Sequence, residues 1–281
     1  MDYINYKTFT AEQDDGILTI TFDNPPVNIQ DIPMLDDLNC LIDQLRDDKT
    51  VKVVVFQSAH PEIFVAHADV HFLKDMSTKA CPREEVELLY LQEVLQRLST
   101  VPQATIAKIE GFARGGGHEF AQACDMRFAV RGKSKFMQME VGMGILPCGG
   151  GASRMARQAG LGRALEIILS GRDFDADEAE AYGTINKALD DDEITVYVNK
   201  LARRIACFPS ESITACKRAV QASIDLPIRD ALYEEAYQLY QATSQTPAIK
   251  RFTMADETGF QNDMENQRNF QNALIDLQEV K

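Results

Sequence analysis

Apolar and polar positions follow two different periods along the first segments of the chain. Residues 16–22, GILTITF, alternate with a period of two, which is typical of a half-buried strand, and the turn residues of DNPPVN end this segment. From Asp31 onward, apolar residues return at the helical spacing of three and four positions. This spacing predicts a helix whose buried face is made of Met34, Leu35, Leu38, Leu41, Ile42 and Leu45.

Continuous apolar runs predict further strands, with a helix between them. Residues 51–57, VKVVVFQ, predict a strand buried on both faces, and we expect a loop over the following segment, SAHPEIFVAHAD. A second helix is expected over about 83–98, and after Pro102 the run ATIAKIEG at 104–111 predicts the next strand. The expected core positions of that helix include Val86, Leu89 and Leu95. The alternation of strands and helices indicates an α/β layer architecture.

The pattern becomes wholly helical towards the end of the chain. Residues 117–123 predict a short buried helix and residues 126–130, MRFAV, a strand. Beyond FPSES at 208–212, the pattern is helical and predicts no further strand. We therefore expect a core over 1–207 and a helical region over 208–281.

Composition and charge narrow the function classes. The chain has 281 residues, 45% of them apolar, and a net charge of −14, which disfavours nucleic acid or an anionic membrane as the main partner. The six cysteines form no CxxC pair and have no metal-ligand spacing, so we expect no metal site. The first residues lack the basic and apolar segments of a signal peptide, and no apolar run reaches the length of a membrane span. A cytoplasmic protein that does not bind membranes is expected.

Three consecutive glycines stand within EGFARGGGHEFAQAC at 110–124. Glycine loses more backbone freedom on folding than other residues, so such a triplet needs a steric or hydrogen-bonding reason. A dinucleotide-binding GxGxxG motif would need glycine where Phe120 stands, and a zinc-protease HExxH motif would need histidine where Gln122 stands. The sequence contains no GxSxG elbow either.

Two interpretations of the glycines remain. A glycine-rich turn at a helix N-terminus leaves backbone N–H groups without acceptors, and the helix dipole favours negative charge there. Gly116 would let the backbone approach a ligand oxygen, and Glu119 lies one turn into the same helix. An oxyanion beside a carboxylate is typical of acyl-group or enolate chemistry. The alternative is a tight packing turn in which Glu119 only caps the helix, and the residues themselves favour neither.

Further segments carry a resemblance to a known family. FVAHAD at 64–69 follows the expected buried strand, and FMQMEVGMGILPCGGG at 136–151 adds the carboxylate of Glu140 and a second glycine cluster. Together with IAKIEGFARGGGHEFAQACDMRFAV, these segments resemble the crotonase superfamily, whose type member is enoyl-CoA hydratase. The resemblance covers nearly the whole chain. It implies the α/β crotonase fold, in which ββα units coil into a superhelix before a C-terminal helical trimerisation region, and it implies homotrimers or homohexamers.

The resemblance also implies a site and a reaction. In the family, two backbone N–H groups hold the thioester oxygen of an acyl-CoA, and these positions match Ala68 and Gly116. The paired glutamates of the hydratases match Glu119 and Glu140, which implies syn addition of water to a 2-enoyl-CoA with no metal or redox cofactor. The residues implied to contact CoA or substrate are Ala66, His67, Asp69, Val70, His71 and Gly115.

Other activities are alternatives on the same scaffold. Double-bond isomerisation, thioester hydrolysis and decarboxylation could use the same two N–H groups to bind the thioester oxygen. One fold can carry several chemistries, so the fold alone does not decide between them. A non-catalytic acyl-CoA-binding protein is a second alternative. The chain departs from the hydratase pattern at His67 and Cys148, which replace glycines, and at Arg114, which replaces an apolar residue. We expect His67 to bond the backbone or CoA and Cys148 to fill a tight loop.

Overall fold

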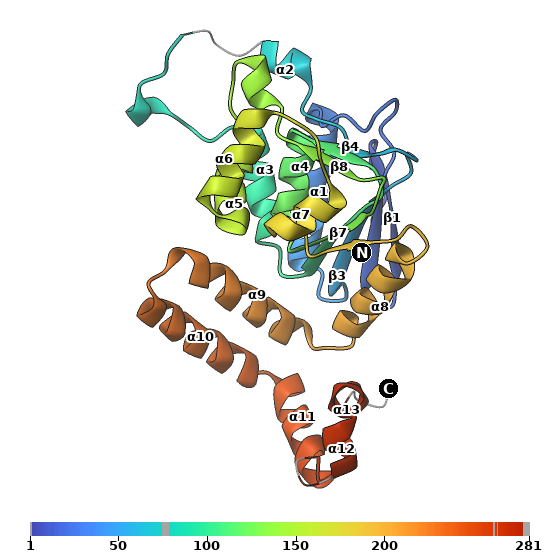
Figure 1. Cartoon of the computed structure of the whole chain (residues 1–281). Helices are drawn as coiled ribbons and strands as arrows, with labels where there is room; N and C mark the ends of the chain where they lie inside the picture. The colour runs from blue at the N-terminus through green and yellow to red at the C-terminus, as the bar shows by residue number, and fades with distance from the viewer. Residues whose placement is uncertain (1, 75–78, 261, 263, 278–281) are drawn as a thin grey trace.

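The strands of the protein form two sheets (Figure 1). The computed structural model describes residues 2–74, 79–260, 262 and 264–277. The larger sheet has the order β1 (Phe9–Asp14), β2 (Ile17–Phe22), β3 (Val53–Ser58), β5 (Ala104–Ile109), β7 (Met126–Val130) and β10 (Lys187–Leu189). The smaller sheet has the order β4 (Ile63–Val65), β6 (Phe112–Arg114), β8 (Lys135–Met137) and β9 (Phe174–Asp175). Only β1–β2 and β8–β9 pair antiparallel among these strands of the described residues.

A ββα unit repeats along the core. In each unit one strand enters the larger sheet, the next enters the smaller sheet, and a helix follows. The units are β3–β4 with α3 (Tyr90–Ser99), β5–β6 with α4 (Gly116–Ala123), and β7–β8 with α5 (Gly151–Ala159). Further helices of the core are α2 (Val70–Lys74), α6 (Leu161–Ser170), α7 (Ala176–Tyr182) and α8 (Ile194–Ala206). The expected α/β crotonase fold is confirmed.

Helix α1 (Ile32–Asp47) crosses from β2 to the parallel strand β3 and carries the apolar face that the sequence predicts. Its first turn is capped because the Asp31 carboxylate accepts a hydrogen bond from the backbone N–H of Met34 at 2.9 Å. All six predicted core positions of this helix are buried. The predicted strand over 51–57 is also confirmed, since β3 packs against α8 on one face and against the main core on the other.

An aromatic cluster fixes the position of α4 in the core. The ring of Phe120 meets the rings of Phe22 and Phe56 edge-on, with centroids 5.2 Å and 5.1 Å away. Such pairs contribute about 0.5–1.5 kcal/mol beyond the apolar area that they bury. All three side chains are fully buried. The N-terminal turn of α4, which holds Gly116 and Glu119, is therefore set on a rigid base.

Two sequence-based expectations were wrong. The segment after β3 is not all loop, because Ile63–Val65 forms β4, a strand too short for a periodic pattern to reveal. The helix expected from about residue 83 begins at Tyr90, and Arg83–Glu85 form a single 3₁₀ turn instead. Val86 is 62% exposed and Leu89 is half-buried, whereas Leu95 is buried as expected. Short helices need an apolar face packed against the protein, and residues 83–88 are all exposed.

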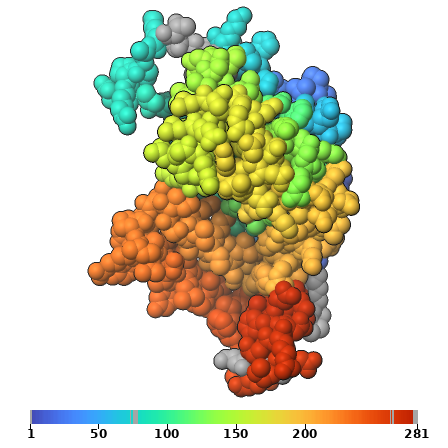
Figure 2. Space-filling view, viewed as in Figure 1, coloured from blue at the N-terminus to red at the C-terminus, as the bar shows by residue number. Residues whose placement is uncertain are grey.

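The elements after Phe208 are all helices in the described part of the chain. They are α9 (Ser210–Asp225), α10 (Ile228–Thr243), α11 (Thr246–Glu257), α12 (Met264–Arg268) and α13 (Phe270–Asp276). Helices α9 and α10 run side by side beneath the core, and α11 to α13 lie beyond them (Figures 1 and 2). A cleft of about 1180 Å³ opens between the core and α9. Leu88, Val220 and Ile224 line this cleft together with the loop residues Gly149 and Gly150.

Candidate active site

The candidate site lies at one edge of the smaller sheet. Strands β4, β6 and β8 run parallel as neighbours, so their carboxyl ends open onto the same edge. The loop after β4 carries Ala68, the turn after β6 carries Gly115 and Gly116, and the loop after β8 leads to Glu140. Sheet order thus brings together three segments that are separate in the sequence.

Two backbone amides converge at this edge. A Cβ atom added at Gly116 would lie 3.0 Å from the backbone nitrogen of Ala68. Neither the Ala68 N–H nor the Gly116 N–H donates a hydrogen bond to an acceptor among the described residues. Gly115 precedes Gly116 and has φ +46°, a left-handed backbone that favours glycine, and its N–H donates to the Met137 carbonyl at 2.9 Å. Two donors without acceptors at a helix N-terminus can bind an anionic oxygen.

Glu119 is held by the second glycine cluster. Its side chain is buried, and its Oε1 accepts a hydrogen bond from the Gly151 N–H at 2.8 Å. A Cβ added at Gly149 would lie 2.6 Å from the Glu119 Oε2, and one added at Gly151 would lie 2.7 Å from Oε1. Glycines 149 and 151 therefore let the chain pass directly against the carboxyl group.

Burial raises the pKa of Glu119 to about 7, and the neighbouring charge of Glu140 adds to this increase. The backbone N–H groups of Gly151 and Gly149 and the charge of Arg154 act in the opposite direction and only reduce it. A carboxyl group with this pKa exchanges its proton near neutral pH, which suits a general acid or base.

Glu140, the second glutamate, lies next to Gly115. It opens the 3₁₀ turn Glu140–Met143, and its Oε1 would lie 2.9 Å from a Cβ added at Gly115. Its Oε2 is buried and has no hydrogen-bond partner in the described structure. Burial raises the pKa of Glu140, while backbone N–H groups and His67 partly offset the increase. Two carboxyl groups with raised pKa values thus lie near the glycine turn, Glu140 beside Gly115 and Glu119 in the first turn of α4.

The raised pKa of Glu119 predicts a pH-dependent cost in stability. The folded state binds this proton more tightly than the unfolded chain does, so wild-type stability falls as pH rises from 4.5 through about 7. Between these limits, the loss amounts to about 3 kcal/mol. Glu119→Gln carries no such proton, so its stability relative to wild type should increase by that amount over the same range. Denaturant unfolding of both proteins on each side of the window measures this difference, and parallel stability profiles would contradict the raised pKa.

Apart from Gly115, the residues implied to contact CoA lie in the segment 66–71, in the loop after β4 and at the start of α2. Ala66 is buried, and its carbonyl accepts the Arg114 N–H at 3.1 Å. His67 is half-buried, with its Nδ1 2.9 Å from the Ala68 carbonyl, so it bonds the backbone as expected. Asp69 Oδ1 accepts the backbone N–H of His71 at 2.9 Å. Val70 and His71 are exposed at the start of α2, on the rim of the site.

Three other polar side chains near the site are either paired or kept uncharged by burial. Arg114 forms a bidentate pair with Asp173, at 2.7 Å and 2.6 Å, so its charge is already matched. Burial, together with Glu119 and Glu140, raises the pKa of the Cys148 thiol to about 11, which keeps it protonated. His118 is fully buried, and burial lowers its pKa to about 3, so its imidazole is neutral.

Gln30 is a site neighbour that the sequence did not indicate. It follows the turn after β2, and a Cβ added at Gly116 would lie 2.2 Å from its side-chain Oε1. A single glutamine before a helix cap carries no motif, and its position depends on the pairing of residue 30 with Ala68 in an isolated β-bridge. Only the folded chain brings this carboxamide to the glycines.

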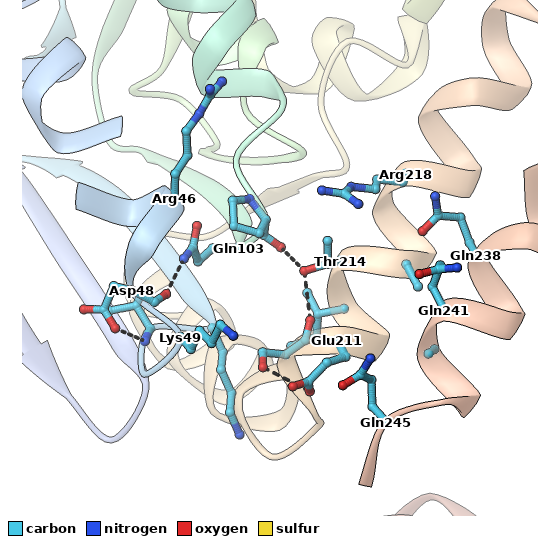
Figure 3. Close-up of a pocket in the computed structure, with 17 residues that line it drawn as sticks. Arg46, Asp48, Lys49, Gln103, Glu211, Thr214, Arg218, Gln238, Gln241 and Gln245 are labelled. Carbon is cyan, nitrogen blue, oxygen red and sulfur yellow. Dashed lines mark hydrogen bonds between the residues drawn. The ribbon is translucent and has the colours of Figure 1, made fainter. Parts of the chain in front are cut away.

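The polar pocket drawn in Figure 3 lies elsewhere. It has a volume of about 300 Å³ and opens between the end of α1 and the helices α9 and α10. Its charged lining residues are Arg46, Asp48, Lys49, Lys52, Glu211 and Arg218. None of the candidate site residues lines it, so it is not the candidate active site.

Two kinds of feature are absent among the described residues. No group of three His, Cys, Asp or Glu side chains there has a geometry that could hold a metal ion. No helix among them combines the length and apolar character needed to cross a membrane.

Comparisons with known proteins agree with one another. The family model described as "Enoyl-CoA hydratase/isomerase" matches residues 12–268. A short-chain-enoyl-CoA hydratase of Clostridium acetobutylicum is 30% identical over 226 residues, which cover 80% of this chain and 85% of the relative. A crotonyl-CoA hydratase of Syntrophomonas wolfei is 30% identical over 232 residues, covering 82% and 88%. The crystal structure of an enoyl-CoA hydratase from Geobacillus kaustophilus superposes with a TM-score of 0.83 at 29% identity, covering 91% and 96%.

Proposed function

The chain belongs to the enoyl-CoA hydratase/isomerase family of the crotonase superfamily, and from this premise we propose that it is an enoyl-CoA hydratase. It adds water across the α,β double bond of a 2-enoyl-CoA and forms a 3-hydroxyacyl-CoA. The observation that carries the proposal is the pair Glu119 and Glu140, both with raised pKa values, beside the unbonded amides of Ala68 and Gly116.

The two amides hold the thioester oxygen. When water attacks the β-carbon, electrons move from the double bond toward this oxygen, and an enolate develops. Preorganised N–H groups in a water-poor site stabilise that charge more than they stabilise the neutral thioester, so they lower the barrier. The dipole of α4 acts in the same direction, since Gly116 is its first residue.

The two carboxyl groups share the proton transfers. Their mutual repulsion and burial favour a pair that carries one proton near neutral pH. The charged carboxylate takes a proton from water as its oxygen bonds to the β-carbon, and the protonated partner delivers its proton to the α-carbon. One proton enters the pair and one leaves it, so each turnover ends with a singly protonated pair.

We propose that the reaction uses no metal or redox cofactor, because the thioester itself acidifies the α-position and carries the enolate charge. The CoA part of the substrate would lie along the loop after β4, from Ala66 and His67 past the half-buried Asp69 to the exposed Val70 and His71. No nucleic acid is proposed as a partner, given the net charge of −14.

The activity is tested with the purified chain and a panel of 2-enoyl-CoA thioesters of increasing length. Loss of the conjugated thioester absorbance, with ¹⁸O from labelled water at the β-carbon, supports hydration. Deuterium from solvent at the α-carbon without ¹⁸O indicates isomerisation, and free CoA without hydration indicates hydrolysis. Binding of acyl-CoA without turnover of any thioester would favour the non-catalytic alternative and overturn the proposal.

Self-association through the tail helices is expected. Helices α9 and α10 expose apolar side chains that water does not favour, among them Val220 and Ile224 on α9 and Leu232, Leu239 and Tyr240 on α10. Burying these faces between copies would give a closed symmetric oligomer, a trimer or hexamer. Light scattering at micromolar concentration should report a multiple of 31.4 kDa, and a mass of one chain would contradict this prediction.

A further inference from the structure

The side chain of Gln30 lies unpaired beside the two candidate amides. It is 3% exposed, and neither its Oε1 nor its Nε2 has a hydrogen-bond partner in the described structure. One point, the Cβ position at Gly116, lies 2.2 Å from the Gln30 Oε1 and 3.0 Å from the Ala68 nitrogen. The carboxamide oxygen therefore lies beside the two amides that we propose to hold the thioester oxygen.

The backbone around Gln30 holds this side chain in place. Its N–H donates to the His67 carbonyl at 2.9 Å, and its carbonyl accepts the Asp69 N–H at 3.1 Å. Just before it, the side-chain amide of Asn28 donates to Ser58 Oγ and to the Phe64 carbonyl. These bonds tie residue 30 to the loop after β4 on both sides of Ala68, so the carboxamide and the amides form one framework.

An unpaired buried carboxamide is unusual in this chain. A polar group buried without a partner costs free energy, so native structures pair nearly all of them. Other buried glutamines are partly satisfied: Gln103 donates to the carbonyls of Leu45 and Asp48, and Gln122 donates to Met155 Sδ. Gln30 is the only side chain of the described residues that has two such unpartnered atoms. A bound ligand with an oxygen acceptor would give the Gln30 Nε2 the partner that the protein does not supply.

We propose that Gln30 donates a third hydrogen bond to the thioester oxygen, a role that rests on the function proposed above. In the structure, its Oε1 is the closest neighbouring atom to the Cβ position at Gly116. A half-turn about the last side-chain torsion, which is broad and roughly two-fold, exchanges Oε1 for Nε2 and turns an N–H toward the oxygen. The bond strengthens as the enolate charge forms, so Gln30 acts in the transition state.

The test compares Gln30→Met with the wild type, because methionine keeps the length of the side chain and removes the N–H. Loss of one oxyanion donor lowers kcat by about 10²-fold or more, while KM changes little. Gln30→Leu gives the same comparison if the methionine variant does not fold. Gln103→Met is the matched control, because it removes a buried glutamine outside the site and should lower stability while kcat stays at the wild-type value.

A second readout separates donation from a structural role. Butyryl-CoA with ¹³C at the thioester carbonyl has no double bond to hydrate, and its carbonyl stretch falls as hydrogen bonds to the oxygen increase. Infrared difference spectra should show a larger downward shift on the wild type and on Gln103→Met than on Gln30→Met. A wild-type kcat and a wild-type shift in folded Gln30→Met or Gln30→Leu would overturn the proposal. A smaller shift in the variant, with no hydration of any enoyl-CoA by wild type, would retain the Gln30 assignment and reject the hydratase function.

Discussion

Gly116→Val is expected to abolish turnover while the protein still folds. A Cβ at this position already lies 3.0 Å from the Ala68 nitrogen and 2.2 Å from the Gln30 Oε1, and the valine methyl groups would extend into the space assigned to the thioester oxygen. Loss of a single oxyanion donor typically costs about 10²–10³ in kcat, and valine would block access to both amides. Steady-state kinetics on the best enoyl-CoA of the panel, with circular dichroism for the fold, measures this effect.

The neighbouring glycines supply the controls. A Cβ at Gly117 would lie 2.0 Å from the Val65 carbonyl oxygen, so Gly117→Ala should impair folding itself. Gly162 in α6 has no atom within 4 Å of an added Cβ, so Gly162→Ala should leave activity unchanged. Near-normal kcat/KM in folded Gly116→Val would remove the proposed binding role of this residue.

The glycine triplet shows where sequence inference stops. The sequence indicates a turn at a helix N-terminus and a ligand at Gly116, but it cannot divide the work among the three residues. The structure does so: Gly115 adopts a left-handed backbone, Gly116 supplies one open amide beside that of Ala68, and Gly117 packs against β4. The last two roles depend on the distance to the loop after β4, a contact between segments far apart in the sequence.

Long elements were predictable because each carries its own pattern. The strand over 51–57 and the helix from Asp31 contain enough apolar positions to fix both type and buried face. Strands β4, β8, β9 and β10 have only two or three residues, too few for a period to emerge. Yet the order of β4, β6 and β8 creates the site, and this order follows from tertiary packing.

The candidate site likewise contains residues that the sequence could indicate and one that it could not. Resemblance to the crotonase superfamily indicated Glu119 and Glu140, and their catalytic role stays a prediction that their raised pKa values support. The sequence could not indicate Gln30, because this residue gains its importance only from its pairing with the loop at Ala68. The prediction for Val86 was wrong for the opposite reason. Its helical spacing suggests burial, but no part of the described chain covers it.

The largest expected effect on the chemistry comes from the two glutamates. Glu119→Gln and Glu140→Gln should each lower kcat by at least about 10²–10⁴-fold, because each removes one of the two proton transfers. Acyl-CoA binding should stay nearly intact, since the amides and the loop after β4 are unchanged. Pre-steady-state and steady-state kinetics, together with calorimetric titration of butyryl-CoA, separate the two effects. Glu12→Gln is the matched control, as Glu12 is exposed on β1.

The double variant tests whether the two carboxyl groups act as one unit. If both act on the same water and the same enolate, removing the second glutamate costs little once the first is gone, and the double variant should be only slightly slower than the slower single variant. Independent roles would instead multiply the two losses. An isomerase that uses a single base would show a large loss at one glutamate and a small loss at the other. That asymmetric result, with a folded protein and intact acyl-CoA binding, would contradict the shared proton relay and point to isomerisation at this site.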